Sequence, residues 1–315
     1  MGIWIFTVSV LILALAALIG GAFYFFRFAI ARPENPADLE EINSPAYDGS
    51  RWHQAARKGL ALMRSLPKEE LFRTSRDGLK LHATFFPASQ PSNRTVLAIH
   101  GYKSCGWKEY SLFLAFYRSL GFNMLLPDNR AHGQSEGNYI GFGNLDRFDC
   151  AMWAEYLAGR FGPDSEILLH GVSMGAATVL SAAGDPLPPQ VKGIVADCSY
   201  TSAWEEFSHE MKRSFHLPVF PILPLCEGIC RIRAGYGFRK NSPLEQVRKA
   251  KVPILFIHGD QDDFVPTQMV YPLFEACPTE KRLLLIEGAK HAESMAAAPE
   301  KYQQAVKDFL KICSK

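Results

Sequence analysis

The sequence predicts an α/β protein in which a mainly parallel sheet is covered by helices on both faces and is preceded by one membrane-spanning helix. Three observations carry this prediction. From Leu79 onward, short apolar runs alternate with longer amphipathic segments, which is typical of a sheet covered by helices. Several short runs are almost continuously β-branched or leucine-rich, as expected of strands buried on both faces. An uncharged apolar stretch over residues 3–26 precedes them all.

Composition fits one globular domain and excludes several classes of partner. The chain has 315 residues, of which 48% are hydrophobic and 21% charged, enough for a sizeable single core. A net charge of +2 gives no electrostatic basis for binding nucleic acid. Seven cysteines, an odd number without C-x-x-C pairs, indicate neither a disulfide framework nor a zinc site. The nearest pair, Cys226 and Cys230, would need two more ligands, so we expect no metal and no cofactor.

The N-terminal apolar stretch predicts an anchor over residues 1–30. About 20 such residues span a bilayer as a helix. A cleaved signal peptide is the alternative, but the stretch is longer than the apolar region of a signal peptide and no positive region precedes it. Arg27 and Arg32 follow the span while only the α-amino group precedes it. This charge bias favours a single-pass protein with a cytoplasmic catalytic domain, although the side of the membrane stays open.

Residues 31–78 read as a linker followed by a helix. Pro33, Pro36 and Pro45 lie among acidic residues, as in a short exposed linker. Apolar residues then recur at helical spacing over 52–66, and Pro67 closes the segment.

The catalytic domain is expected over residues 79–315. We expect strands at 81–86, 95–99, 123–126, 166–169, 193–196, 254–257 and 282–286. Helices are expected at 109–120, 145–160, after Ser173, and at 267–276 and 299–312. Functional residues in such sheets gather beyond the carboxyl ends of the strands.

Ser173 is the candidate nucleophile. It stands in Gly171-Val172-Ser173-Met174-Gly175, after a predicted strand and before an alanine-rich helix, which is the context that the G-x-S-x-G motif requires. The turn is tight and strained, so the two glycines give the strand and helix room to approach. It also aims the Met174 amide at the place where an oxyanion would form. An ordinary strand-to-helix turn is the alternative.

His291 is the candidate general base, because serine needs an adjacent base oriented by a carboxylate. It follows the last predicted strand and completes the chain order serine, acid, histidine. The other histidines near strand ends each precede a glycine and favour structural roles in turns; these are His100, His132, His170 and His258.

Asp262 is the preferred acid among three aspartates that follow the 254–257 strand. It lies at the apex of the loop, ahead of Val265-Pro266. Asp260 and Asp263 fit a solvated turn better. Asp197, at the end of an earlier strand, is an outside candidate.

A second oxyanion donor is expected from the turn after the 95–99 strand. The Tyr102 backbone N–H is placed to supply it. The polar loop over 127–135 reads as a hydrogen-bonded segment that supports the site.

Five segments in this order resemble the serine-hydrolase branch of the α/β-hydrolase superfamily: HGYKS, PDNRAHGQSEG, GVSMG, HGDQDDFVP and AKHAES. They are particularly similar to bacterial membrane-anchored hydrolases of the esterase-like and serine-aminopeptidase-like kinds. The resemblance runs from about Leu79 to the C-terminus and implies an α/β-hydrolase fold. It also implies Ser173, Asp262 and His291 as a catalytic triad, with the Met174 and Tyr102 amides as oxyanion donors. Lipase-type relatives have a glycine-rich HGGG turn where this chain has Tyr102 and Lys103, so classification as a lipase is doubtful.

An insertion over 198–245 is expected to form a small helical lid. Its apolar, proline-interrupted part over 199–239 is longer than a crossover needs and fits a cap on an acyl pocket; a crossover helix with a packing loop is the equal alternative. The side chains expected to contact substrate are Tyr102, Lys103, Phe207, Met211 and Phe264.

These features favour hydrolysis of a hydrophobic acyl or aryl ester, either a small molecule or lipid-like. A peptidase or amidase acting on short peptides is the first alternative, for which Glu205 and Glu206 could bind an amino terminus. The second, from another class, is an inactive hydrolase fold that serves as a membrane-bound binding module.

Overall fold

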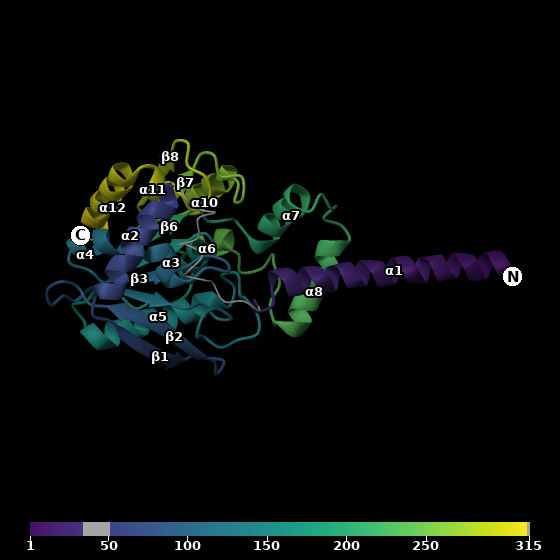
Figure 1. Ribbon diagram of the computed structural model, residues 1–315, viewed down its shortest axis with the longest axis horizontal. Helices are drawn as coiled ribbons and strands as arrows, with labels where there is room; N and C mark the ends of the chain where they lie inside the picture. The colour runs from purple at the N-terminus through teal and green to yellow at the C-terminus, as the bar shows by residue number, and fades with distance from the viewer. Residues whose placement is uncertain (34–50, 314–315) are drawn as a thin grey trace.

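The computed structural model describes residues 1–33 and 51–313, and in them one mixed sheet carries the fold. Eight strands run in the order β1-β2-β4-β3-β5-β6-β7-β8, with helices on both faces (Figure 1). The pairs β1–β2 and β2–β4 are antiparallel, and every later pair is parallel. This confirms the predicted fold class. The linker prolines Pro36 and Pro45 lie outside the described residues.

The seven predicted strands are present, and one more precedes them. That additional strand, β1, is mostly exposed, so its sequence shows no apolar run that could predict a strand. The sheet therefore begins at Glu69, ahead of the boundary expected at Leu79. The strands are β1 Glu69–Thr74, β2 Lys80–Phe86, β3 Arg94–Ile99, β4 Asn123–Pro127, β5 Glu166–Val172, β6 Val191–Asp197, β7 Ile254–Gly259 and β8 Lys281–Ile286.

The helices differ from expectation in two places. The helix expected at 109–120 is two short helices, and the one expected at 267–276 begins with a 3-10 turn, Thr267–Met269. Around the sheet lie α2 Arg51–Ser65, α3 Gly106–Tyr110, α4 Leu114–Ser119, α5 Asp146–Phe161, α6 Met174–Ala182, α9 Pro243–Val247, α10 Val270–Ala276, α11 Ser294–Ala297 and α12 Pro299–Cys313.

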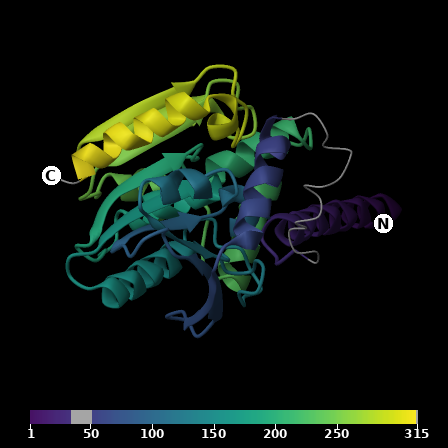
Figure 2. The ribbon, with the colours of Figure 1, turned by 60° about the vertical axis from the view of Figure 1, so that its left-hand side comes forward.

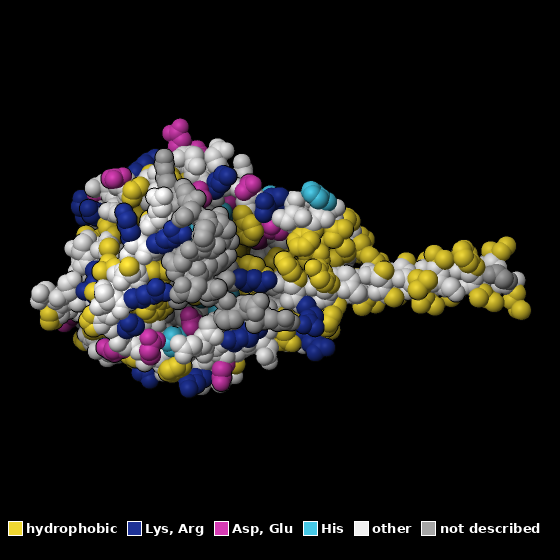
Figure 3. All heavy atoms as spheres, in the orientation of Figure 1, with side chains coloured by type: hydrophobic (Ala, Val, Ile, Leu, Met, Phe, Trp, Pro, Cys, Tyr) yellow, Lys and Arg dark blue, Asp and Glu magenta, His cyan; other side chains and the backbone are white. Residues whose placement is uncertain are grey.

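The N-terminal helix α1, Gly2–Ala29, leaves the domain as a rod (Figures 1 and 2). Its stretch Ile3–Ala29 is long and apolar enough to cross a membrane, judged by length and composition alone. Apolar side chains cover the projecting part (Figure 3). Its C-terminal end packs against α8 Ile222–Arg233, which with α7 Ala203–Arg213 forms a cap over the strand ends.

The predicted insertion over 198–245 contains more than this cap. Its last helix, α9, packs against α6 on the main domain. At that contact Gly184 approaches Gln246 so closely that a Cβ would overlap the glutamine side chain. The two cap helices are therefore the part of the insertion that stands over the site.

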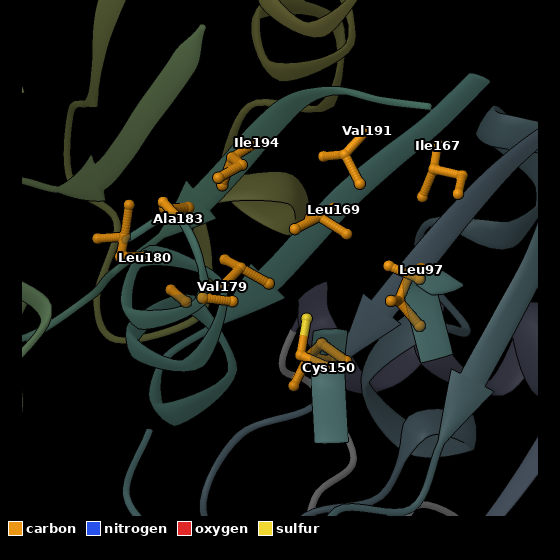
Figure 4. Close-up of a cluster of buried hydrophobic side chains, with 14 of the residues drawn as sticks. Leu97, Cys150, Ile167, Leu169, Val179, Leu180, Ala183, Val191 and Ile194 are labelled. Carbon is orange, nitrogen blue, oxygen red and sulfur yellow. The ribbon is translucent and has the colours of Figure 1, made fainter. Parts of the chain in front are cut away.

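Two hydrophobic cores lie on opposite faces of the sheet. Leu97 points into the core under α5 and α6, while its neighbours Val96 and Ala98 point into the core under α2, α4 and α12. Figure 4 shows part of the first core, where Leu169 lies near Val179 of α6 and Leu97 lies near Cys150 of α5. Because neighbouring strand residues face opposite cores, both sets must be apolar. This explains the unbroken apolar runs of the sequence.

Candidate active site

Ser173 lies on a strained turn between β5 and α6. Its φ of 57° and ψ of −119° are unfavourable for a residue with a side chain. The turn depends on its two glycines. A Cβ on Gly171 would overlap the backbone of Gly175, and a Cβ on Gly175 would overlap the carbonyl of Ile99. The G-x-S-x-G pattern is therefore a requirement of this backbone.

A line of hydrogen bonds joins the three residues that the motifs selected. Ser173 Oγ lies 2.8 Å from His291 Nε2, and His291 Nδ1 lies 2.8 Å from Asp262 Oδ2. They come from three loops at the carboxyl ends of β5, β7 and β8. This arrangement allows the neutral imidazole to accept the serine proton at Nε2 while Nδ1–H donates to the carboxylate.

Asp262 is held as a carboxylate by the groups around it. Its Oδ1 accepts hydrogen bonds from the amides of Phe264 and Val265, at 3.1 and 2.9 Å. Burial alone would raise the pKa of Asp262, but hydrogen bonds from His258 and His291 outweigh it and lower the pKa to about 2. The carboxylate is therefore ionised at neutral pH and can stabilise a protonated His291.

His258 is a supporting residue that sequence reasoning assigned to a structural turn. Its Nε2 lies 3.0 Å from the carbonyl of Val265 and 3.3 Å from Asp262 Oδ2. Both neighbours are acceptors, so Nε2 carries the hydrogen and donates. The sequence shows that His258 lies one residue before Gly259, at the end of a strand. It does not show that the His258 side chain reaches Asp262 in the following loop.

The competing aspartates are engaged elsewhere. Asp260 Oδ1 accepts the amide of Gly288 at 2.7 Å. The side chain of Asp263 is largely exposed. Asp197 Oδ1 accepts the hydroxyl of Ser294 at 3.1 Å.

The other strand-end histidines hold structural positions. His100 Nε2 accepts the amide of Asn129 at 3.0 Å. His170 lies between the hydroxyls of Tyr117 and Tyr302, each 3.1 Å from one ring nitrogen. Burial lowers the pKa of His100 to about 4 and that of His170 to about 3, so both rings are neutral at pH 7.

The turn after β3 leaves one amide between two that are occupied. The amide of Gly101 donates to Glu109 Oε2 at 2.6 Å, and the amide of Lys103 donates to His132 Nε2 at 3.1 Å. The Tyr102 amide lies between them, in a residue that lines the same pocket as Ser173. Met174 opens α6, and the first amides of a helix have no partner within it. These are the two amides that the sequence indicated as oxyanion donors.

The polar loop over 127–135 forms hydrogen bonds with the turn after β3. Asn129 Nδ2 donates to the carbonyl of His100 at 2.8 Å. Arg130 binds Asp149 through two nitrogens, at 2.7 and 2.8 Å, and also reaches Asp77. His132, which accepts from Lys103, belongs to the same loop.

A largely apolar pocket of about 270 Å³ opens at Ser173. Tyr102, Phe207 and Phe264 line it, as expected, together with Met174 and Phe142. The end of α1 and the segment over 203–233 supply further apolar wall residues, which are Phe25, Phe28, Ala29, Ile30, Phe215, Leu223 and Cys226. Polar side chains of the same segment also line the pocket: Glu206, Glu210, Arg213 and Ser214.

Two residues expected to contact substrate lie elsewhere. Met211 is fully buried in the core between the cap and α1, where it packs instead of facing the pocket. Lys103 turns its ammonium group toward α1 and donates to the carbonyl of Phe28 at 2.8 Å. It lines a separate cleft with Arg27 and Arg32. The sequence could not indicate this partner, because α1 lies more than 70 residues away along the chain.

Glu206 is a buried acidic residue in the wall of the pocket. It is only 4% exposed, and neither carboxylate oxygen has a hydrogen-bond partner among the described residues. Burial raises the pKa of Glu206 well above its ordinary value, and the nearby charges of Glu210 and Asp262 act in the same direction. The neighbouring Glu205 is exposed, since it lies on the outer face of α7.

One group of possible metal ligands overlaps this site. Ligand atoms of Cys198, Asp262 and His291 lie within 4.8 Å of one another. Burial, with the charges of Asp197 and Asp262, raises the pKa of the Cys198 thiol well above its ordinary value. A thiol must lose its proton to ligate, and His291 already bridges Asp262 and Ser173. The group therefore fits a metal poorly.

This chain is similar in sequence to a family of hydrolases. The sequence model of the serine aminopeptidase family matches residues 90–218. The Bacillus subtilis protein YqkD is 31% identical over 198 residues, which cover 63% of this chain and 65% of that protein. An uncharacterized membrane protein of Saccharomyces cerevisiae is 24% identical over 264 residues, covering 82% of this chain and 86% of that protein.

Solved structures share the fold. An esterase of Pyrococcus furiosus superimposes with a TM-score of 0.64 at 25% identity, covering 78% of this chain and 91% of that chain. An acylaminoacyl peptidase of Pyrococcus horikoshii gives a TM-score of 0.56 at 16% identity, covering 81% of this chain and 43% of that chain. The second likeness concerns the fold alone.

Proposed function

We propose that this chain, which belongs to the α/β-hydrolase superfamily, is a membrane-anchored serine hydrolase that cleaves carboxylic esters through an acyl-enzyme on Ser173. The observation that carries the proposal is the hydrogen-bonded series from Ser173 through His291 to Asp262 at an apolar pocket. The likeness to an esterase at 25% identity supports the same reaction class.

In the first step, His291 Nε2 takes the proton of Ser173 as Oγ attacks the ester carbonyl. The carboxylate of Asp262 stabilises the imidazolium that forms. His258 and the Phe264 and Val265 amides keep that carboxylate in position. His291 then returns the proton to the leaving alcohol, and the acyl group stays on Ser173.

Negative charge develops on the carbonyl oxygen during this attack. The amides of Tyr102 and Met174 are the donors that would receive it. Water, activated by the same His291, then attacks the acyl-enzyme and releases the acid. Each proton therefore passes through one imidazole nitrogen.

The apolar wall supports a hydrophobic acyl or aryl group on the substrate. Phe207 comes from the cap helix α7, Phe264 from the loop after β7 and Tyr102 from the turn after β3. Such a lining gains free energy mainly by excluding water from apolar groups. Methylene groups added to the substrate should therefore raise kcat/KM until the pocket is filled.

Turnover of nitrophenyl esters by the full chain in phosphatidylcholine nanodiscs tests the proposal. Ser173→Ala should abolish turnover, with a loss on the order of 10⁴–10⁶. Ser181→Ala, which changes a buried serine of α6 outside the pocket lining, is the matched control and should retain it. A folded wild-type chain without turnover of any ester would instead favour the inactive binding module.

Glu206 favours a second candidate, hydrolysis of amides or short peptides. A buried carboxyl group without a protein partner is costly unless a ligand satisfies it. The amino terminus of a peptide would do so, and the match to the serine aminopeptidase family supports this possibility. A hydroxyl group of an ester substrate would serve equally well as a donor.

Matched substrates separate the two candidates. A nitrophenyl ester and a nitroanilide of one amino acid, each with a free or a blocked amino group, would be compared in wild type and Glu206→Gln. An aminopeptidase requires the free amine and loses at least about tenfold in kcat/KM with Glu206→Gln. An esterase cleaves the blocked ester and leaves both anilides intact.

A further inference from the structure

We propose that the end of α1 and the cap form one bilayer-facing entrance to the pocket, so that the substrate is a bilayer-resident amphiphile whose acyl chain lies against α1. This inference rests on the proposed function, because it names the substrate class of the same site. It gives α1 a role beyond tethering.

Helix α1 divides into a free part and a packed part. Side chains from Ile3 to Ala17 are exposed, whereas Ala22, Phe25, Phe26 and Ile30 are buried against the domain. At a rise of about 1.5 Å per residue, the residues from Ile3 to Ala22 span roughly 30 Å, the thickness of the hydrocarbon core. The remaining turns therefore lie at the membrane surface and belong to the catalytic domain.

The residues at the boundary between the free and the packed part of α1 are of the types found at a membrane–water interface. Tyr24 is exposed and Arg27 lies in the last turn of α1. Aromatic and basic side chains are enriched where a helix leaves the bilayer. Arg231 and Arg233 lie in the last turn of α8, which packs beside α1. Basic side chains gather at this base of the rod (Figure 3).

The packed end of α1 is held firmly to the turn that carries the Tyr102 amide. The Tyr102 hydroxyl donates to the carbonyls of Phe28 and Ala29 at 3.2 and 3.1 Å, and Lys103 Nζ donates to Phe28 at 2.8 Å. These are carbonyls at the end of the helix, which lack partners within it. The nearby Arg32 donates to two further loop carbonyls at 2.6 and 2.7 Å. These hydrogen bonds fix the end of α1 to the same loops that form the pocket.

Two phenylalanines of α1 form part of the pocket wall. Phe25 and Phe28 contact Phe215 of the cap, with ring centroids 4.7 and 5.5 Å apart. Phe28 lines the pocket and is also 45% exposed, so it lies at the mouth. An acyl chain that reaches Ser173 through this mouth passes along the membrane helix.

The cap continues the apolar surface of α1. Phe220 is 77% exposed and Ile232 is 85% exposed, and Leu217 and Leu225 are partly exposed. The connection between α7 and α8 extends alongside α1 (Figure 1), and apolar side chains run from the rod onto the cap (Figure 3). Such a surface, continuous with a membrane helix, suits the acyl region of a bilayer.

The pocket wall is tested by shortening its phenylalanines in the full chain in phosphatidylcholine nanodiscs. In Phe28→Ala and Phe25→Ala, the ratio of kcat/KM for nitrophenyl laurate to that for nitrophenyl acetate should fall about tenfold. Phe6→Ala, the same change on the free part of α1, should leave this ratio and the acetate turnover unchanged. An unchanged laurate-to-acetate ratio in Phe28→Ala would overturn the inference. If wild type cleaves neither ester, the proposed function fails instead.

The bilayer contact is tested without catalysis. Trp fluorescence of Phe220→Trp, after subtraction of the wild-type signal, should be quenched in nanodiscs made with dibrominated phosphatidylcholine. Phe72→Trp, at an exposed position on the edge strand β1, is the control and should not be quenched. Equal quenching of both, or of neither, would contradict a cap that lies in the bilayer.

Discussion

Replacement of Asp262 by asparagine should nearly abolish turnover while the fold persists. Four groups surround this carboxylate: His291 Nδ1 at 2.8 Å, His258 Nε2 at 3.3 Å, and the Phe264 and Val265 amides at 3.1 and 2.9 Å. All four are donors. The amide nitrogen of an asparagine must therefore face a donor in either orientation.

If that nitrogen faces His291, the imidazole must shift its hydrogen to Nε2. It then donates to Ser173 Oγ and cannot accept the serine proton. A wrong tautomer of this kind costs about 10⁴ in kcat, or about 5 kcal/mol of transition-state stabilisation. If the nitrogen faces the two backbone amides instead, the 262–265 loop is disturbed and activity is again lost.

The assay is turnover of nitrophenyl butyrate by the full chain in nanodiscs, with protein concentration fixed by absorbance and folding checked by circular dichroism. Asp263→Asn is the matched control, because the Asp263 side chain is largely exposed, and it should stay within about threefold of wild type. Asp262→Asn within tenfold of wild type would refute the reasoning, as would an equal loss in Asp263→Asn.

The same site predicts a dependence of stability on pH. The pKa of Asp262 is lowered from 3.8 to about 2 in the folded chain. Its stabilising contribution, roughly 2 kcal/mol, is therefore present above about pH 4 and is lost as the pH falls toward 2. Urea denaturation in dodecyl maltoside at pH 3 and 6 should show a larger loss of stability in wild type than in Asp262→Asn.

Four further substitutions, one of them a control on α5, test the structure around the site. Burial raises the pKa of Glu109 to about 7, so its stabilising contribution is complete below about pH 4.5 and is lost as the pH rises through 7. Glu109→Gln should therefore gain stability relative to wild type between pH 5 and 8 in urea titrations, and a constant difference would contradict this. Arg130→Gln leaves the buried Asp149 without its partner and should lower the free energy of unfolding by about 3–5 kcal/mol; a loss below 1 kcal/mol would argue against the pair. Gly175→Ala should prevent folding, because its Cβ would overlap a carbonyl, whereas Gly159→Ala on α5 has open space and should raise stability by up to about 1 kcal/mol. If Gly175→Ala were expressed as a folded protein at the level of Gly159→Ala, the prediction for Gly175 would be contradicted.

The fold was predictable because its signals are local. Strands such as β5 and β7 are buried on both faces, and this forces apolar runs that a sequence displays. The edge strand β1 has mostly exposed residues, so it left no such signal. The division of one expected helix into α3 and α4 depends on how Tyr110 and Leu114 pack under the sheet, which no local pattern records.

Site residues follow the same rule. Ser173 carries a local motif whose glycines the backbone requires, and the chain order pointed to the other two residues. His258 and Glu109 act through particular partners, Asp262 and the Gly101 amide, and residue type alone could not reveal these pairings. Lys103 and Met211, which were also expected to contact substrate, lie outside the pocket lining for a related reason: they contact or pack near the end of α1. The sequence suggested an anchor separate from the catalytic domain, because the composition of residues 1–30 shows only that they are long and apolar enough to span a membrane. It could not show that the end of α1 packs against α8.

The central claim is that Ser173 becomes covalently acylated. Its most direct test is intact-protein and peptide mass spectrometry of the full chain in nanodiscs after treatment with a fluorophosphonate. One adduct should form, on Ser173 within the tryptic peptide 161–192, and it should disappear in Ser173→Ala and slow greatly in Asp262→Asn. A folded chain that forms no adduct, or an adduct that persists in Ser173→Ala, would contradict the account.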